Sequence, residues 1–144
     1  MTMNLKKLLI LIGVFLALTA SVSAPAAADA GTTAYNSKTQ YLSQWPLDNW
    51  DNSCVERRIY LAAGNYDWEQ FWRDSVTPLR TNLYLGAGWY TWTDCLDPRN
   101  NYYDHTTSLN PDNPNWETVV GEVVWQINSS GEYTWGSFLE PKSF

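Results

Sequence analysis

Apolar and polar positions alternate with a period of two in three segments of the chain that share one frame. Residues 59–68 read IYLAAGNYDW and residues 83–92 read LYLGAGWYTW, so both follow [IL]-Tyr-Leu-[AG]-Ala-Gly-x-Tyr-x-Trp. A looser copy at residues 124–135 ends in GEYTW. A period of two places successive side chains on opposite faces of a β-strand, and glycine permits a tight turn. Each frame therefore predicts a strand, a glycine turn and a second strand.

The three frames together predict an all-β fold. Three Gly-turn hairpins supply at least six strands, which suits a small single-domain β-sandwich or barrel. The tyrosine and tryptophan that end each frame are expected in its core, at Tyr66/Trp68, Tyr90/Trp92 and Tyr133/Trp135. Residues 102–109 predict a further strand, with Tyr103, His105, Thr107 and Leu109 on one face.

The N-terminus has the layout of a secretory signal. Lys6 and Lys7 precede an apolar run, residues 8–18, and small residues follow as far as Ala28-Asp29-Ala30. The run is about half as long as a bilayer-spanning helix. We therefore expect residues 1–30 to be a signal peptide, and the protein to be secreted and extracellular.

Residues 31–52 differ in composition from the rest and predict an extended N-terminal arm before a β-sandwich domain at residues 53–144. The arm contains Tyr35, Tyr41, Trp45 and Trp50 among polar residues, with almost no aliphatic ones. Two interpretations are open. The arm packs its aromatic side chains on its own sandwich, or it inserts into the groove of a partner, for which Trp and Tyr are favoured anchors.

The two cysteines, Cys54 and Cys95, predict one disulfide bond, since an exported chain meets oxidising conditions. Closing a loop of about 40 residues would stabilise the domain by about 3–4 kcal/mol in the chain-entropy model. The bond would tie the first two frames together.

The formal net charge of −6 at pH 7 narrows the choice of partner. An acidic surface repels phosphate backbones and anionic lipids, so we expect no nucleic-acid and no membrane partner. Other secreted proteins, or a carbohydrate, fit an acidic and aromatic-rich protein better.

No set of residues predicts catalysis. His105 is the single histidine, no serine lies in a nucleophile-elbow pattern, and the cysteines are expected to be paired. One histidine and two paired cysteines cannot form a zinc site, and the Asp- and Asn-rich residues 97–112 lack the spacing of a calcium loop. We therefore predict no enzyme, no metal and no cofactor, and a structural or surface role for His105.

The excess of aromatic residues is the strongest functional signal. Nine Trp and nine Tyr exceed what one small core can bury. Tyr60 and Tyr84 are out of phase with their aliphatic neighbours and predict an exposed aromatic face. Trp89 lies at a predicted hairpin tip, as a binding anchor or packed under a loop. The candidate partner-binding residues are Tyr35, Tyr41, Trp45, Trp50, Tyr60, Tyr84 and Trp89.

Three segments also carry a family resemblance: IYLAAG at 59–64 shortly after Cys54, YTWTDCL at 90–96 and YTWGSFL at 133–139. The frame resembles that of secreted bacterial β-sandwich modules, including carbohydrate-binding ones. More narrowly, the chain resembles small secreted proteins of filamentous soil bacteria, among them the adaptor subunits of umbrella toxin particles. Such an adaptor joins a lectin-like subunit to a large toxin-bearing subunit. The resemblance implies that the arm inserts into the former and the sandwich grips the latter.

The leading hypothesis is therefore a non-enzymatic secreted protein-binding module, an adaptor joining other secreted proteins in a larger complex. One alternative is a carbohydrate-binding module in which Trp89 or Tyr84 stacks on sugar rings. Another is a secreted hydrolase inhibitor, since small disulfide-bonded β domains present rigid loops.

Overall fold

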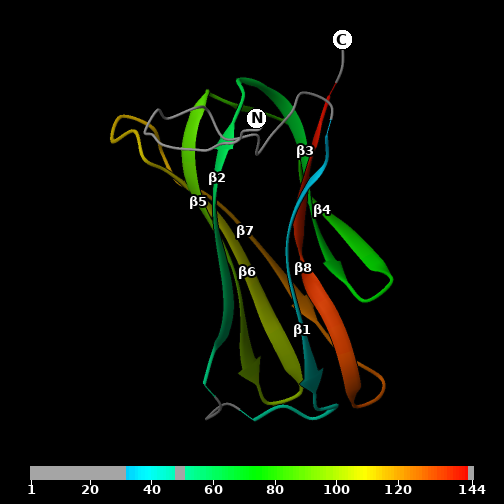
Figure 1. Cartoon of the computed structure of the whole chain (residues 1–144). Coiled ribbons are helices and arrows are strands. Elements are labelled where there is room, and N and C mark those ends of the chain that lie inside the picture. The colour runs from blue at the N-terminus through cyan, green and yellow to red at the C-terminus, as the bar shows by residue number, and fades with distance from the viewer. Residues whose placement is uncertain (1–31, 48–50, 143–144) are drawn as a thin grey trace, which may run out of the picture.

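The computed structural model describes residues 32–47 and 51–142, and this part of the chain is all-β with no helix (Figure 1). The predicted signal peptide at 1–30 lies outside the described residues. The strands are β1 (Ala34–Leu42), β2 (Ser53–Leu61), β3 (Gly64–Trp72), β4 (Ser75–Leu85), β5 (Gly88–Arg99), β6 (Tyr102–Pro111), β7 (Val119–Trp125) and β8 (Gly131–Pro141). The predicted strand near residues 102–109 is β6.

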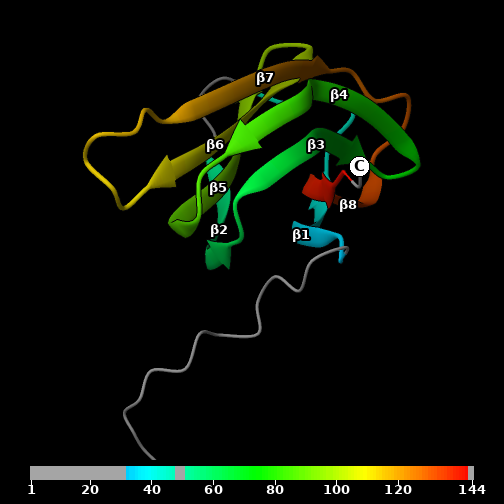
Figure 2. The ribbon, with the colours of Figure 1, turned by 90° about the horizontal axis from the view of Figure 1, so that it is seen from above.

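The strands form two four-stranded antiparallel sheets, which confirms the predicted all-β fold and, of the two predicted architectures, is the sandwich. One sheet has the order β1-β8-β3-β4 and the other the order β2-β5-β6-β7. Seen from above, β4 and β7 lie toward one side of the molecule, and β1 and β2 toward the other (Figure 2). We call the sheet β1-β8-β3-β4 the β8 sheet and the sheet β2-β5-β6-β7 the β5 sheet.

The three repeated frames are crossings between the sheets, and the prediction that each is a hairpin was wrong. In every frame the first strand lies in one sheet and the second in the other: β2 and β3, β4 and β5, β7 and β8. The hairpins are β3–β4, β5–β6 and β6–β7, which pair within a sheet. A period of two is the same for strands that pair and for strands that cross, so alternation alone could not separate them.

A tyrosine hydrogen bond spans each crossing. The hydroxyl of Tyr66 donates to the carbonyl of Ala62 (2.6 Å), and that of Tyr90 donates to the carbonyl of Gly86 (2.8 Å). Tyr133 makes the same bond four residues back along the chain, over 2.9 Å. A tyrosine bonded to backbone a few residues upstream is known as a tyrosine corner and stabilises connections between the sheets of a sandwich. The repeated Gly-x-Tyr therefore marks a corner.

The core is built on the tryptophans of the three frames, as predicted. Trp68, Trp92 and Trp135 are fully buried, and the tyrosines two residues before them are at most 5% exposed. They belong to two adjoining apolar clusters, with Trp68 and Trp92 in one and Trp135 in the other.

The predicted division at residue 53 does not follow the strands. Within the predicted arm, residues 34–42 form β1, which pairs with β8 from Ala34↔Leu139 to Leu42↔Gly131. Inward and outward positions alternate along β1, with Asn36 and Leu42 buried and Tyr35 and Tyr41 exposed. This part of the arm is thus a strand of the sandwich, but its aromatic side chains Tyr35 and Tyr41 point outward, so the choice between the two interpretations of the arm stays a prediction.

The predicted disulfide between Cys54 and Cys95 is present. The two residues are directly opposite each other on β2 and β5, with Cα atoms 4.1 Å apart, so the bond joins strands of the first two frames. Such a bond is compatible with an extracellular protein. Within residues 32–47 and 51–142, no helix is long and apolar enough to cross a membrane.

Candidate functional site

The single histidine belongs to a polar network inside the sandwich. Nε2 of His105 lies 2.8 Å from Oδ1 of Asp94, and Oγ1 of Thr107 lies 2.5 Å from the same oxygen. From the β8 sheet, Nδ2 of Asn36 and Oγ of Ser137 donate to Oδ2 over 2.7 and 2.8 Å. A carboxylate can only accept, so the four donors converge on one acceptor group and tie the two sheets together.

This network is structural because it has no access to solvent. Asp94, His105, Thr107 and Ser137 are 0% exposed. Ser137 also accepts a hydrogen bond from the indole of Trp92, over 2.9 Å. A substrate cannot reach any of these groups, so the site of function has to be sought on the surface.

Aromatic side chains gather on the outer face of the β8 sheet. The ring centroids of Tyr35 and Phe138 are 5.5 Å apart, and that of Phe71 lies 6.3 Å from Tyr35 and 6.4 Å from Phe138. Val76 on β4 is paired with Phe71 and is 51% exposed, and Tyr35 is 54% exposed. We call Tyr35, Phe71, Val76 and Phe138 the aromatic patch.

Gly136 on β8 allows the close approach of β1 on which the aromatic patch depends. Gly136 is paired with Phe71 on one side and with Ser37 on the other, and its φ is +155°. A Cβ at Gly136 would lie 1.9 Å from the carbonyl oxygen of Asn36. Only glycine fits this approach of β1 to β8, which carries Tyr35 to the rings of the other strands.

Carboxylates flank the aromatic patch on the same face. Glu69 is paired with Phe138, and Asp67 with Glu140. Partial burial, followed by the charges of Asp67 and Glu140, raises the pKa of Glu69 above its usual range. The pKa of Asp67 is lowered, chiefly by the backbone N–H of Asn82 and then by the ammonium of Lys142 at 3.1 Å. The patch thus has an acidic rim.

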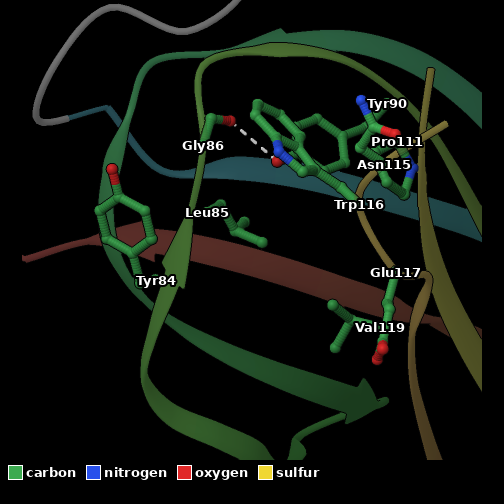
Figure 3. A pocket seen from close by; sticks show the side chains of 9 residues that line it. All are labelled: Tyr84, Leu85, Gly86, Tyr90, Pro111, Asn115, Trp116, Glu117 and Val119. Carbon is green, nitrogen blue, oxygen red and sulfur yellow. Dashed lines mark hydrogen bonds between the residues drawn. The ribbon is translucent and has the colours of Figure 1, made fainter. Parts of the chain in front are cut away.

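A second candidate surface is a pocket of ≈ 420 Å³ where β4 ends and β7 begins (Figure 3). Tyr84 and Trp116 lie at its rim, 65% and 40% exposed, and Glu117 and Val119 line another side. A Cβ at Gly86 would lie 2.5 Å from the ring of Trp116. The first frame has Ala62 at this position, so the change to glycine makes room for the indole.

The seven predicted partner-binding residues do not form one site. Tyr35 belongs to the aromatic patch and Tyr84 to the pocket beside Trp116. Tyr41 is exposed at the far end of β1, and Trp45 is exposed and lines a separate pocket of ≈ 440 Å³ with Asn101 and Ile127. Trp50 lies outside the described residues.

Tyr60 and Trp89 lie on the outer face of the β5 sheet. Their rings meet edge to face with centroids 5.7 Å apart, and the guanidinium of Arg58 lies 4.5 Å from the centroid of Trp89. Arg58 in turn forms an ion pair with Asp112. Trp89 is therefore half-buried under a side chain instead of standing free as an anchor.

Phe71, Phe138 and Trp116 are candidate residues that the sequence reasoning missed. Phe71 and Phe138 are out of phase with the buried residues of their strands, the same signal that singled out Tyr60 and Tyr84. Applying that rule to every strand would have found both. Trp116 is in a loop, where no alternation of buried and exposed positions could assign its side chain to the surface.

Comparison with known protein families, curated proteins and solved structures found no match for this chain. A proposal for its function rests on the geometry described above.

Proposed function

We propose that this protein is a secreted, non-enzymatic adaptor that binds a partner protein on the aromatic patch of the β8 sheet. The observation that carries the proposal is the cluster of Tyr35, Phe71 and Phe138, whose rings touch on an exposed sheet face. Contiguous exposed apolar surface rimmed by polar groups marks interaction sites. Aromatic side chains are also enriched at the centres of protein interfaces.

The acidic rim defines the chemistry of the partner. Glu69, Asp67 and Glu140 lie next to the patch. Burial, and after it the charges of Asp67 and Glu140, raises the pKa of Glu69, and a cation on the partner would relieve the repulsion among the three carboxylates. The complementary surface is an apolar centre flanked by Lys or Arg. Opposite charges at the rim chiefly speed association, so the association rate constant should fall as salt is added.

An adaptor needs a second binding surface, and the pocket beside Trp116 supplies a candidate. The aromatic patch includes Val76 near the start of β4, whereas the pocket includes Tyr84 near its end. Two partners can therefore be held at opposite ends of one strand. The predicted signal peptide and the disulfide bond between Cys54 and Cys95 support an extracellular place of action.

Co-purification from the culture supernatant of the source cells tests the proposal. Tagged wild-type protein should retain a large secreted protein in stoichiometric amount, identified by mass spectrometry. The double variant Tyr35→Ser/Phe138→Ser should lose that protein, because both rings leave the patch. Tyr41→Ser is the matched control, since Tyr41 lies on the same strand and face but outside the patch. Retention of the same proteins by the double variant would refute the role of the patch.

Carbohydrate binding is the second candidate function, and the pocket supports it. The indole of Trp116 lies against Gly86 and stays partly exposed, and an exposed aromatic ring beside polar groups is typical of small-ligand sites. Polysaccharide pull-down with wild type and Trp116→Ala tests this candidate. Equal retention of both would exclude Trp116 as the platform.

A further inference from the structure

The two sheets end in four edge strands, and β7 differs from the other three. An edge strand offers unpaired N–H and C=O groups to a further strand, and proteins usually block this with charges, proline or irregular pairing. β4 contains Pro78, a positive φ at Asn82 and register shifts against β3. β2 contains Arg57 and Arg58.

β1 carries Lys38, and the guanidinium of Arg57 on β2 donates to its backbone carbonyl at Tyr35. Nζ of Lys38 donates to the hydroxyl of Ser53 at the start of β2, over 2.9 Å. β7, by contrast, reads VVGEVVW, with no proline, lysine or arginine and no register shift against β6. Of the four edges, β7 is the one with neither a proline, a register shift nor a basic residue, and its single charge is the carboxylate of Glu122.

The outer face of β7 is exposed and carries two valines, one on either side of Glu122. Val120 and Val124 point outward and are 49% and 56% exposed. The inward-facing Val119 and Val123 are only half-buried, whereas His105, opposite Val123 on β6, is fully buried. β4 of the facing sheet packs on the inner face of β7, where a Cβ at Gly121 would lie 2.9 Å from the side chain of Leu79, so the open parts of β7 are its outer face and its backbone edge.

Glu122 makes β7 unsuited to pairing with a second copy of itself. It is the middle residue of the strand, so an antiparallel pair of two β7 strands in full register would place Glu122 opposite Glu122. Like charges directly opposite each other destabilise a strand pair. Asp104 on β6 adds to this, because its hydrogen bond and charge raise the pKa of Glu122. The same carboxylates favour a cation on an incoming strand.

The pocket beside Trp116 lies at the N-terminal end of the β7 edge. Val119, the first residue of β7, lines the pocket together with Trp116 and Glu117 (Figure 3). In recognition by strand addition, backbone hydrogen bonds supply affinity and pockets for side chains supply specificity. A chain that leaves the β7 edge at Val119 would arrive at this pocket.

We propose that β7 binds an extended segment of a partner protein as an additional antiparallel strand of the β5 sheet. The segment carries apolar residues opposite Val120 and Val124, Lys or Arg opposite Glu122, and an apolar or aromatic residue that enters the pocket at Trp116. This proposal rests on the proposed adaptor function and assigns the chemistry of its second partner.

Two synthetic peptides test the edge directly on the purified full chain. The first reads Ser-Val-Thr-Lys-Thr-Val-Trp-Thr, in which Trp lies opposite Val119 and shares its inward direction toward the pocket, and the second has Glu in place of Lys. Wild type should bind the Lys peptide about ten-fold more tightly, since cross-strand charge pairs carry effects of this order. Hydrogen exchange should slow at the amides of β7. Equal affinity for the two peptides, or protection at another edge, would overturn the proposal.

A charge-reversal variant tests whether the peptide preference depends on Glu122 itself or on the net negative charge of the protein. Glu122→Lys should invert the preference for the two peptides. Glu56→Lys is the control, because Glu56 is an exposed carboxylate on the outer face of the opposite edge strand β2, and it should keep the wild-type preference. Loss of the preference in both variants would show that net charge alone selects the peptide, against the proposal.

The capture assay distinguishes failure of this inference from failure of the adaptor function. If Glu122→Lys retains every protein that wild type captures while the patch variant loses one, strand addition at β7 is refuted and the adaptor stands. If the peptides bind β7 but wild type captures no protein, the edge site stands and the adaptor function is refuted.

Discussion

Replacement of Asp94 by Asn is expected to destabilise the fold severely. The carboxylate accepts hydrogen bonds from His105, Thr107, Asn36 and Ser137, two at each oxygen. An amide has nearly the same shape but offers one accepting oxygen, so its NH₂ group would face two donors. The two groups left without an acceptor each cost about 1–3 kcal/mol when buried. We expect a loss of roughly 3–5 kcal/mol, comparable to breaking a buried ion pair.

Urea unfolding followed by tryptophan fluorescence measures this loss. With a slope of about 1–3 kcal/mol/M for a small protein, the midpoint should fall by more than about 1 M. Asp112→Asn is the control, since Asp112 pairs with Arg58 on the surface, where both side chains are about half exposed and such pairs contribute at most about 1 kcal/mol. A loss below about 1 kcal/mol for Asp94→Asn would show that the donors find other acceptors, and would refute the structural role assigned to the network.

Four further predictions concern the corner hydrogen bonds, the titration of the corner tyrosines, the centre of the β8 sheet and the disulfide. Tyr90→Phe removes the hydrogen bond to Gly86 and should lower the free energy of unfolding in urea by about 0.5–1.5 kcal/mol. An unchanged free energy would mean that this hydrogen bond does not stabilise the fold. Burial raises the pKa of Tyr66 and of Tyr90, so the folded state holds these protons more tightly than the unfolded chain. Stability should therefore be complete below pH about 10 and fall as pH rises through the folded pKa values, which unfolding at a series of alkaline pH values measures. Gly136→Ala should unfold the domain or displace β1, seen as lost amide protection on that strand, because its Cβ meets backbone. Reduction of the disulfide should lower the free energy of unfolding by about 3–4 kcal/mol, and an unchanged midpoint would contradict the loop-closure argument.

The repeated frame shows what a local sequence pattern can predict and what it cannot. Alternation located the strands, and the phase of each frame identified Trp68, Trp92 and Trp135 as core. The same pattern could not tell a hairpin from a crossing, because both need a turn and two alternating strands. The bond from tyrosine to the carbonyl four residues back is local, so Gly-x-Tyr at the turn was the available signal for a corner.

The candidate surfaces depend on contacts between distant parts of the chain. Tyr35, Phe71 and Phe138 come from β1, β3 and β8, and they meet because β8 lies between the other two strands. The out-of-phase rule indicates that each ring points outward, but it does not bring them together. The network at Asp94 is similar, since its polar residues are placed inward on four different strands.

By itself the sequence determined the class of the fold, the strands of the three frames, their core aromatic residues and the cysteine pairing. These follow from local periodicity and from the fact that two cysteines allow one intramolecular bond. Only the tertiary structure decided which strands pair, that residues 34–42 complete a sheet, that the aromatic patch is continuous and that the β7 edge is open. The reason is that strand order results from the summed packing of both sheets, and no local alternation of side chains encodes it.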